Sequence, residues 1–364
     1  MHDEPASLAS RLRQRAHAAI AADGGWWPFD RFMAFALYEP GLGYYSRSDR
    51  MFGAMPSYGS DFVTAPELSP LFGAALAAQV AQALDATGTD EVWEFGAGSG
   101  KLAGQLLRAL GPRVRRYRIV DLSGALRARQ QESLAAFGAQ VSWETALPSQ
   151  LEGVVVGNEV LDAMPVQLLH FDGAQWFERG VGSDGARFGW SDRPTALRPP
   201  LAAPYVPGTV TEIHPQAEAF IRTLAATLKR GAVFLIDYGF PEAEYYLPQR
   251  HGGTLMCHQA HRADADPLSD LGEKDITAHV NFSGIALAGQ DAGLTVLGYT
   301  SQARFLLNCG LADLLESADL PARSAAQKLV NEHEMGELFK VIGFATGEGF
   351  DALGFRAGDR SHRL

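Results

Sequence analysis

Residues 91–102 read EVWEFGAGSGKL. The first five residues predict a buried strand, three alternating glycines follow it, and the leucine spacing that begins at Leu102 predicts a helix over 100–110. In open α/β sheets, a strand that runs through a glycine-rich turn into a helix binds a nucleotide cofactor at the carboxyl edge of the sheet. The stretch therefore predicts a parallel α/β fold with a cofactor turn at residues 96–100.

The charge beside this turn indicates which cofactor it binds. Glu94 lies two residues before Gly96, and a carboxylate there suits S-adenosylmethionine, whose sulfonium and ammonium groups are both positive. A dinucleotide pyrophosphate is an anion that binds backbone amides at a helix N-terminus, and its fingerprint requires Gly or Ala where Lys101 stands. A P-loop is excluded because only three residues separate Gly96 from Gly100. A tight strand-to-helix turn without a ligand stays open as the alternative.

The composition of the 364-residue chain is that of a soluble globular protein, with 46% hydrophobic and 20% charged residues. No apolar run approaches the roughly 20 residues that cross a membrane, so we expect no membrane insertion. The formal net charge of -11 argues against nucleic-acid binding and is compatible with a cationic substrate. Cys257 and Cys309 lack disulfide or zinc spacing, and the N-terminus lacks an apolar signal core. These features predict a cytoplasmic protein.

Strands and helices alternate beyond the glycine turn, as in a parallel sheet with helices on both faces. We expect strands at 91–95, 117–121, 139–143, 153–157, 232–237, 294–300 and 337–345, and helices at 5–22, 69–84, 100–110, 124–137, 216–229, 282–291, 302–317 and 322–333. Two segments interrupt this alternation. Residues 166–214 are rich in Gly, Pro and aromatic residues, which favours short antiparallel strands. Residues 238–280 are irregular, and long irregular stretches inside a domain are usually functional.

Polar residues stand at the ends of the second and third strands. Asp121 ends the second strand, where an acid can accept both ribose hydroxyls of a nucleotide, or can cap the next helix together with Ser123. Trp143 and Glu144 end the third strand, where a ring edge and a carboxylate can meet adenine and its amino group. The alternative for this pair is a core tryptophan beside a solvated acid. All of these strand ends lie on the carboxyl edge of the sheet, where ligands bind.

The fourth strand, 153–157, leads into the stretch NEVLDAMP at residues 158–165. Asn158 brings a carbonyl acceptor and amide donors, and Glu159 and Asp162 bring two carboxylates. If residues 159–162 are helical, their spacing puts both acids on one face. A guanidinium is planar and carries a fork of donors that matches carboxylates. The alternative is a first helical turn whose acids favour the helix dipole.

Several long motifs together resemble those of the MidA family of S-adenosylmethionine-dependent methyltransferases. The shared stretches are 37–45, 61–67, 94–100, 157–165, 236–239 and 275–280, with shorter matches at 253–255 and 336–340. The eukaryotic members are mitochondrial complex I assembly factors with protein-arginine methyltransferase activity. The resemblance implies a class I, Rossmann-like methyltransferase fold: a mixed seven-stranded sheet with helices on both faces, an N-terminal helical segment and antiparallel insertions. It implies S-adenosyl-L-methionine as cofactor and a protein with an exposed arginine as substrate.

The resemblance and the patterns together divide the chain into five parts. We expect a helical and loop segment over 1–88 that covers the cofactor site, and an antiparallel insertion over 166–214. The methyltransferase core takes 89–165 and 215–345, and within it the irregular stretch 238–280 forms a substrate wall. Residues 346–364 form a C-terminal tail. Because we expect no organelle presequence, the substrate of the eukaryotic members does not carry over automatically.

The expected site combines residues from most of these parts. The resemblance implies a cofactor turn at Gly96, Gly98 and Gly100, a ribose acid at Asp121, and the Asn158–Glu159 pair beside them. The cofactor-binding residues that we expect are Thr64, Glu67, Glu94, Gly96, Ala97, Gly98, Ser99, Gly100, Asp121, Leu122, Ser123, Trp143, Glu144 and Asn158. The expected catalytic residues are Glu159, Asn158 and Asp162, and the expected substrate-binding residues are Glu212, Asp237 and Tyr238.

Individual roles within this site follow from the chemistry. We expect Glu159 to orient the guanidinium and localise its charge, with Asp162 or Glu212 assisting. Glu67 can hold the ammonium of the cofactor and Thr64 its carboxylate, unless their loop is only structural. Asp237 and Tyr238 line the substrate entry or complete the sheet edge. The residues Cys257, His258, His261 and His251 show no zinc spacing, so we expect no metal.

Two other functions compete with methyl transfer. One is an assembly or chaperone-like partner whose cofactor site is vestigial or regulatory. The other is an NAD-dependent oxidoreductase. The intact glycine turn with Glu94, Asp121 and the Asn158–Glu159 pair favours the methyltransferase. The target protein, the number of methyl groups and the oligomeric state, monomer or homo-oligomer, stay open.

Overall fold

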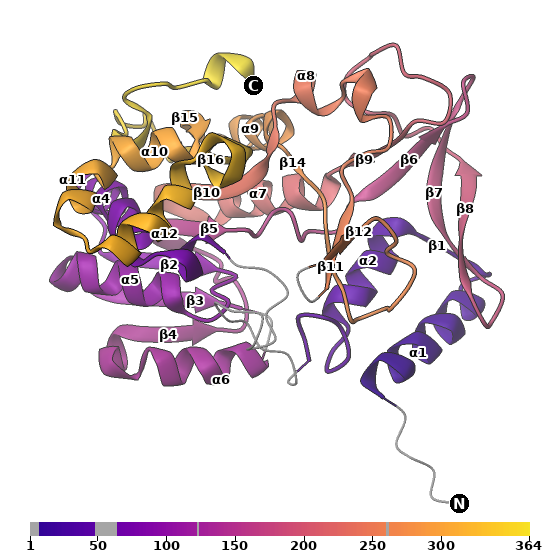
Figure 1. Cartoon of the computed structure of the whole chain (residues 1–364), viewed down its shortest axis with the longest axis horizontal. Coiled ribbons are helices and arrows are strands. Elements are labelled where there is room, and N and C mark those ends of the chain that lie inside the picture. Colours follow the sequence, from indigo (N-terminus) through magenta and orange to yellow (C-terminus); the bar gives the residue numbers. More distant parts are fainter. Residues whose placement is uncertain (1–6, 48–63, 122–123, 260–261) are drawn as a thin grey trace, which may run out of the picture.

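A mixed sheet forms the centre of the fold in the computed structural model, which describes residues 7–47, 64–121, 124–259 and 262–364 (Figure 1). Its strand order is β15-β16-β10-β5-β2-β3-β4, and the short β14 (Val280–Asn281) pairs with β10. The seven strands are β2 (Glu91–Phe95), β3 (Arg116–Val120), β4 (Val141–Glu144), β5 (Leu151–Asn158), β10 (Leu228–Phe240), β15 (Thr295–Ser301) and β16 (Phe339–Ala345). β16 runs antiparallel to both neighbours, whereas β10, β5, β2, β3 and β4 are parallel. The predicted mixed seven-stranded sheet is confirmed.

Helices cover both faces of this sheet because its central strands are apolar on both sides. In β5, Val154 and Val156 belong to one hydrophobic cluster and Val155 to another, as the two-residue period of a strand requires. The first cluster includes residues of α4 (Pro70–Thr87), α5 (Lys101–Leu110), α10 (Gln302–Asn308), α11 (Leu311–Ser317) and α12 (Leu320–Val330). The second includes residues of α7 (Pro215–Thr227) and α9 (Phe282–Asp291).

A second body lies beside the central sheet, on the right in Figure 1. It contains α1 (Leu8–Ala22), α2 (Phe29–Tyr38) and an antiparallel sheet of order β1-β7-β6-β9 with β8 on β7. These strands are β1 (Trp26–Pro28), β6 (Gln167–Phe171), β7 (Trp176–Ser183), β8 (Phe188–Pro194) and β9 (Val210–Ile213). A small sheet adds β11 (Met256–Gln259), β12 (Arg262–Asp264) and β13 (Asp275–Thr277). One cluster that includes Leu12, Phe32, Val181 and Ile276 joins these parts.

Local signals set several helix ends. α4 begins at Pro70, and the Ser69 side chain accepts a hydrogen bond from the amide of Leu71 at 3.2 Å, as the proline and serine pattern predicts. The helix predicted over 302–317 is divided into α10 and α11, because Gly310 adopts φ 86 between them. The helix predicted over 124–137 ends earlier, with α6 (Gly124–Ser133), and 3-10 turns over Ala135–Gln140 follow.

The remaining short helices are α3 (Ala65–Leu68) and α8 (Glu242–Tyr245). Across the described parts of the chain, no helix combines the length and the apolar character that crossing a membrane would need.

Candidate functional site

A cavity of about 710 Å³ opens at the carboxyl edge of the parallel strands. The ends of β2, β3 and β5 contribute Phe95, Val120 and Asn158 to its lining. Tyr38 and Tyr45 of the second body line it as well. The cavity therefore lies where open α/β sheets bind their ligands, between the central sheet and the second body.

The glycine turn forms one side of this cavity. Gly96, Gly98 and Gly100 have φ values of 63, 53 and 80, in the left-handed region that favours glycine. A Cβ on Gly98 would meet nothing within 4 Å, so at that position the backbone conformation alone requires glycine. Gly96, Ala97, Gly98 and Ser99 line the cavity as expected, whereas Gly100 starts α5.

Glu94 lines the cavity from the strand that leads into the turn. The residue is buried, and the hydroxyl of Tyr117 donates a 2.7 Å hydrogen bond to its Oε2. Burial raises the pKa of Glu94 to about 8, and the charge of Asp121 adds to this effect. A cation bound in the cavity would favour the ionised carboxylate.

Asp121 also lines the cavity, and a residue that the sequence analysis did not identify holds it there. Gln130 is fully buried on α6 and donates hydrogen bonds to Asp121 Oδ2 at 2.8 Å and to the Gly98 carbonyl at 3.0 Å. The indole of Trp143 donates to Gln130 Oε1 at 2.9 Å. Gln130 thus links the glycine turn to the expected ribose acid. Its only sequence signal is a place on the helix that follows Asp121.

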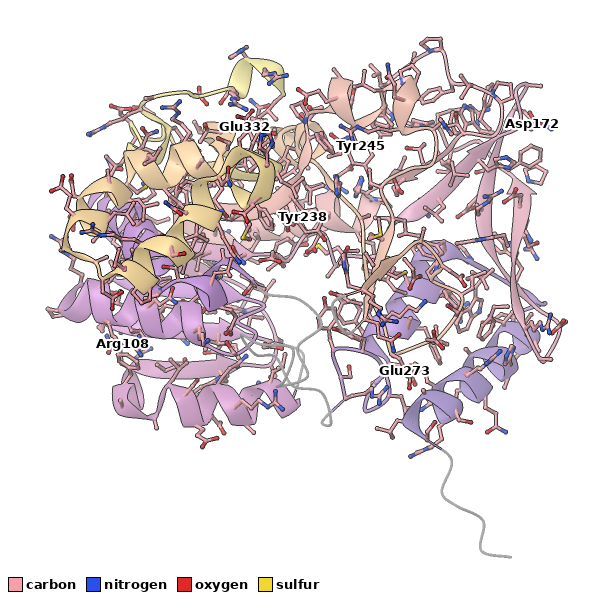
Figure 2. The ribbon with its side chains drawn as sticks, viewed as in Figure 1. Arg108, Asp172, Tyr238, Tyr245, Glu273 and Glu332 are labelled. Carbon is pink, nitrogen blue, oxygen red and sulfur yellow. The ribbon has the colours of Figure 1, made fainter. Side chains whose placement is uncertain are left out.

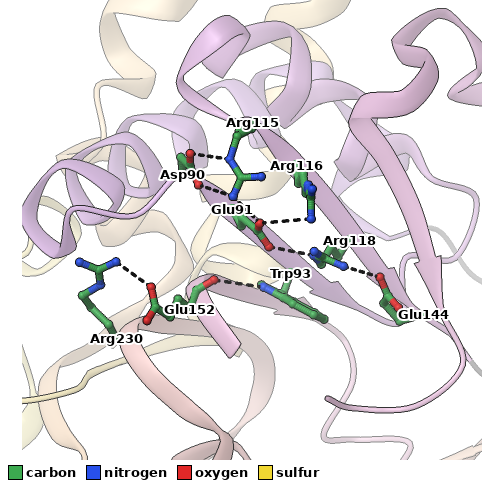
Figure 3. Close-up of polar contacts among 9 residues, drawn as sticks. All are labelled: Asp90, Glu91, Trp93, Arg115, Arg116, Arg118, Glu144, Glu152 and Arg230. Atoms are coloured by element: carbon green, nitrogen blue, oxygen red, sulfur yellow. Dashed lines mark hydrogen bonds and ion pairs between the residues drawn. The ribbon is translucent and has the colours of Figure 1, made fainter. Parts of the chain in front are cut away.

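Trp143 and Glu144 lie outside the lining of the described cavity, and their expected contacts with adenine stay a prediction. Trp143 bonds to Gln130, and Glu144 accepts a 2.7 Å hydrogen bond from Arg118 of the neighbouring strand (Figure 3). The same guanidinium bonds to Glu91 at 2.8 Å. The loop that follows β4 lines the cavity instead, through Thr145, Ala146 and Leu147. The predictions for Leu122 and Ser123 fall outside the described residues.

The segment around α3 closes the cavity over the glycine turn. Thr64 and Glu67 line the cavity, and the Glu67 carboxylate accepts hydrogen bonds from Ser99 Oγ and from the ammonium of Lys101. These contacts attach the segment to the turn that carries Ser99 and Lys101. Residues 61–63 of the same motif lie outside the described part of the chain.

The acids that follow β5 line the cavity, and the possible helix over 159–162 does not form. Glu159 adopts φ 55, a left-handed conformation that is uncommon for a residue with a side chain. Its amide donates to the Ile236 carbonyl at 2.9 Å. The next amides, of Val160 and Leu161, donate to Asp237 Oδ2 at 3.1 and 2.9 Å. Asp237 of β10 thus holds the amides that follow Glu159, whose left-handed conformation lies outside helical geometry. We call residues 158–162 the acid turn.

Two acceptor atoms of the acid turn are unsatisfied. Asn158 donates from Nδ2 to Glu159 Oε1 at 2.9 Å, and the hydroxyl of Tyr238 donates to Asp162 Oδ2 at 2.6 Å. The opposite oxygens, Asn158 Oδ1 and Asp162 Oδ1, are buried and have no hydrogen-bond partner in the described structure. A buried acceptor without a donor is costly. Both residues line the cavity, so a ligand with N–H groups would satisfy them.

The carboxyl groups of the acid turn hold protons more tightly than usual. Glu159 is partly exposed as a residue, but burial of its carboxyl group and the charge of Asp162 raise its pKa to about 8. Burial raises the pKa of Asp162 to about 6, against the hydrogen bond from Tyr238. Carboxyl groups with raised pKa values in a cavity are typical of a functional site.

Within the described structure none of Glu212, Asp237 and Tyr238 lines the cavity, and their expected substrate contacts stay a prediction. Glu212 is fully buried, and its Oε1 accepts hydrogen bonds from the amides of Thr254 and Leu255 at 2.8 and 3.0 Å. Glu212 therefore anchors the irregular stretch to β9. Asp237 and Tyr238 lie behind the acid turn, and Figure 2 places Tyr238 near the centre of the molecule, between its two bodies.

The cavity lining also includes aromatic residues that the sequence analysis did not assign to the site. The rings of Tyr38 and Tyr45 stack with centroids 5.6 Å apart and planes inclined by 20°. The Tyr38 hydroxyl donates to the Ala163 carbonyl and the Tyr45 hydroxyl to Asp275 Oδ1, both at 2.8 Å. Both tyrosines lie in the motif 37–45, but their spacing in the sequence does not indicate a binding or catalytic role. Four residues of α7 extend the wall: Gln216, Ala219, Phe220 and Thr223.

The lining is strongly acidic. Its acidic members are Glu67, Glu94, Asp121, Glu159 and Asp162, and among the described residues of the lining Lys101 is the only Lys or Arg. Lys101 is already paired with Glu67. The cavity therefore suits a cationic ligand. In the described ranges, no group of His, Cys, Asp and Glu residues is arranged to hold a metal ion.

Comparisons with known proteins point to the same chemistry. Residues 75–300 match a family model described as "Putative S-adenosyl-L-methionine-dependent methyltransferase". The crystal structure of a Burkholderia thailandensis protein bound to S-adenosyl-homocysteine is 53% identical, covers 99% of both chains and superposes with a TM-score of 0.95. A native crystal structure from the same organism is 52% identical, with a TM-score of 0.90 and 99% of both chains covered.

More distant relatives carry a more specific name. "Protein arginine methyltransferase NDUFAF7, mitochondrial" of Danio rerio is 28% identical over 85% of this chain and 81% of its own length. The Caenorhabditis elegans homolog of the same name is 26% identical over 77% of this chain and 72% of its own.

Proposed function

This chain belongs to the family of S-adenosyl-L-methionine-dependent methyltransferases, and we propose that it transfers a methyl group to an arginine side chain of a protein. The family and the cofactor, S-adenosyl-L-methionine with S-adenosyl-L-homocysteine as product, agree with the sequence-based predictions. The arginine acceptor rests on the acid turn and on the names of distant relatives. The cytoplasmic location stays a prediction.

The residues around the glycine turn fit this cofactor. Gly98 leaves the backbone bare at the cavity lining, since a Cβ there would meet nothing within 4 Å. Asp121 and Glu94 present carboxyl groups for ribose hydroxyls and for positive charge, and the cavity holds acids rather than a cradle of cations for a pyrophosphate. We assign cofactor binding to Gly96, Ala97, Gly98, Ser99, Glu94 and Asp121, with Thr64 and Glu67 at the methionine end.

The observation that carries the acceptor assignment is the pair of buried, unsatisfied oxygens on Asn158 and Asp162. A guanidinium presents several N–H donors in one plane, so it can satisfy both oxygens at once and leave a carboxylate beside it. An ammonium is a compact point charge without this planar fork. We therefore propose arginine rather than lysine as the acceptor.

The reaction is a displacement in which positioning and charge dominate. When bound, S-adenosyl-L-methionine supplies a methyl group that bonds to the acceptor nitrogen as its bond to sulfur breaks, which leaves neutral S-adenosyl-L-homocysteine. Asp162 and Asn158 hold the guanidinium and draw its positive charge away from the attacking nitrogen. That nitrogen loses one proton, which the Glu159 carboxylate takes. A carboxyl group whose pKa is about 8 is suited to accept a proton near neutral pH.

A transfer assay tests this proposal directly. The protein is incubated with methyl-labelled S-adenosyl-L-methionine and two matched peptide libraries, one with arginine and one with lysine at the same position. We expect labelled methylarginine after acid hydrolysis, with Glu159→Gln reduced about a hundredfold. Label on lysine or on another residue would contradict the acceptor. Binding of S-adenosyl-L-homocysteine without transfer to any library or to host-cell protein would support the non-catalytic alternative.

A further inference from the structure

Asp237 and Tyr238 are neighbours on β10, directly behind the acid turn. Asp237 is buried, and its Oδ2 accepts hydrogen bonds from three successive amides, those of Val160, Leu161 and Asp162, at 3.1, 2.9 and 3.3 Å. Its Oδ1 accepts from the amide of Tyr238 at 3.0 Å. One carboxyl group of β10 thus fixes the backbone that follows Glu159.

Almost every polar atom of Asp162 makes a hydrogen bond. Its amide donates to Asp237, its carbonyl accepts from Ala278 at 3.0 Å, and its Oδ2 accepts from the Tyr238 hydroxyl at 2.6 Å. Oδ1 remains, buried and without a partner in the described structure, on a residue that lines the cavity. The contacts therefore leave one oxygen of Asp162 for a ligand.

The ring of Tyr238 is itself held in place. It packs edge-on against His279 at 5.1 Å and against Phe339 at 5.4 Å between ring centroids. A phenol fixed on both sides can hold the carboxylate to which it donates in one orientation. The left-handed Glu159 needs similar support, because a non-glycine residue keeps a strained backbone only where its surroundings enforce it.

We propose that Asp237 and Tyr238 are positioning residues for methyl transfer. Asp237 holds the backbone of the acid turn, and Tyr238 turns Asp162 so that Oδ1 faces the acceptor. Neither residue touches the acceptor or the cofactor; both act through the acid turn. This inference rests on the proposed function, since it assigns the supports of the carboxylate that would bind the acceptor guanidinium.

Tyr238→Phe is the first test, because it removes one oxygen and keeps the ring. We expect kcat/KM for an arginine peptide to fall about ten- to a hundredfold, while the Kd for S-adenosyl-L-homocysteine stays unchanged. The matched control is Tyr246→Phe, a buried phenol outside the cavity lining whose hydroxyl donates to the Glu212 carbonyl at 3.0 Å. The control should lose stability without a change in acceptor kinetics.

A second readout needs no turnover. In protein labelled with ¹³C at aspartate carboxyl groups, Asp162 should titrate at a higher pH in Tyr238→Phe than in the wild type, because the phenol no longer favours the ionised form. The titratable groups that face Asp162 are Glu159, Asp237, Tyr38, Tyr45 and Tyr238. These groups, apart from the hydroxyl removed, are the same in both proteins, so the difference reports the Tyr238 bond.

Asp237→Asn is the second variant, since it keeps the size of the side chain but replaces one acceptor oxygen with a donor. We expect a fall in kcat that is larger, as a fold-change, than any change in KM for the cofactor. Unchanged acceptor kinetics in both variants, together with an unchanged Asp162 titration in Tyr238→Phe, would overturn the inference. If the titration shifts but the wild type methylates no arginine peptide, the positioning of Asp162 stands and the proposed acceptor fails.

Discussion

Tyr117 donates a 2.7 Å hydrogen bond to Glu94, and the two residues lie on adjacent parallel strands, β3 and β2. Glu94 lines the cavity, whereas Tyr117 is fully buried beneath it. The bond favours the ionised form of a carboxyl group whose pKa burial raises. A core residue thereby influences the charge of a carboxyl group that lines the cavity.

Tyr117→Phe should weaken cofactor binding. Without the phenol, the pKa of Glu94 rises further, so less carboxylate faces the cation near pH 7.5. We expect the Kd for S-adenosyl-L-methionine to increase about tenfold, as measured by titration calorimetry. Tyr205→Phe, which removes a hydroxyl bonded to the Leu201 carbonyl in the second body, should leave the Kd unchanged. If the wild type, Tyr117→Phe and Tyr205→Phe bind S-adenosyl-L-methionine with equal Kd values, Glu94 does not contribute to cofactor binding.

Gly98→Ala and Gly111→Ala form a matched pair. The two glycines have φ values of 53 and 54, and a Cβ on either would meet nothing within 4 Å. Both substitutions should therefore lower the free energy of unfolding through backbone strain alone, Gly98→Ala by about 1–2 kcal/mol and Gly111→Ala by more, because its ψ of -128 lies outside the left-handed helical region. Only Gly98 lines the cavity, so calorimetry should detect weaker S-adenosyl-L-homocysteine binding in Gly98→Ala only. Equal affinities in the two variants would contradict the assignment of the turn.

Asp162→Asn should impair transfer without loss of the cofactor. The amide keeps the size of the side chain but removes the charge that holds the guanidinium, so we expect kcat for an arginine peptide to fall about a hundredfold. Asp359→Asn is the control, because Asp359 is another hydrogen-bonded aspartate: its Oδ1 accepts from the Tyr299 amide at 2.9 Å, near the C-terminus. Wild-type turnover in Asp162→Asn, measured with labelled cofactor, would exclude its proposed role.

The stability of the protein without ligands should depend on the protonation of Glu159. Its pKa is about 8 in the folded protein and 4.5 ordinarily, so between these values the folded state holds a proton that the unfolded state has lost. Stability therefore falls as the pH rises from 4.5 to 8. Urea unfolding should give the wild type a lower free energy of unfolding at pH 8 than at pH 6. In Glu159→Gln this difference between the two pH values should be smaller by on the order of 2 kcal/mol.

The control for this pH dependence is Glu132→Gln, which changes an exposed carboxyl group on α6. It should keep the wild-type difference between pH 6 and pH 8. If Glu159→Gln keeps that difference as well, the proton of Glu159 is not held in the way described here.

The parts of the fold that depend on local pattern could be predicted from the sequence. The strand at 91–95 and the helix at 282–291 have the predicted bounds, because apolar periodicity and the residues at their ends determine them. Residues 96–99 of the glycine turn and Asp121 line one cavity, since one strand–turn–helix unit and the end of the next strand place them together.

Other features of the site depend on residues distant in sequence. Glu159 adopts a left-handed conformation, and the amides that follow it donate to Asp237 on another strand. Glu144 lies outside the cavity lining because Arg118 of the neighbouring strand binds it. Gln130 and Tyr38 join the site through tertiary packing. No local sequence motif predicts these contacts between distant residues, so only the structure could identify them.

A crystal structure of the protein with S-adenosyl-L-homocysteine and an arginine peptide tests the central claim most directly. We predict that the adenosyl product lies against the glycine turn and Asp121, and that the guanidinium lies within hydrogen-bond distance of Asn158 Oδ1 and Asp162 Oδ1. The account would be contradicted by a guanidinium that binds elsewhere, while those two oxygens stay without a partner or accept hydrogen bonds from the protein's own side chains.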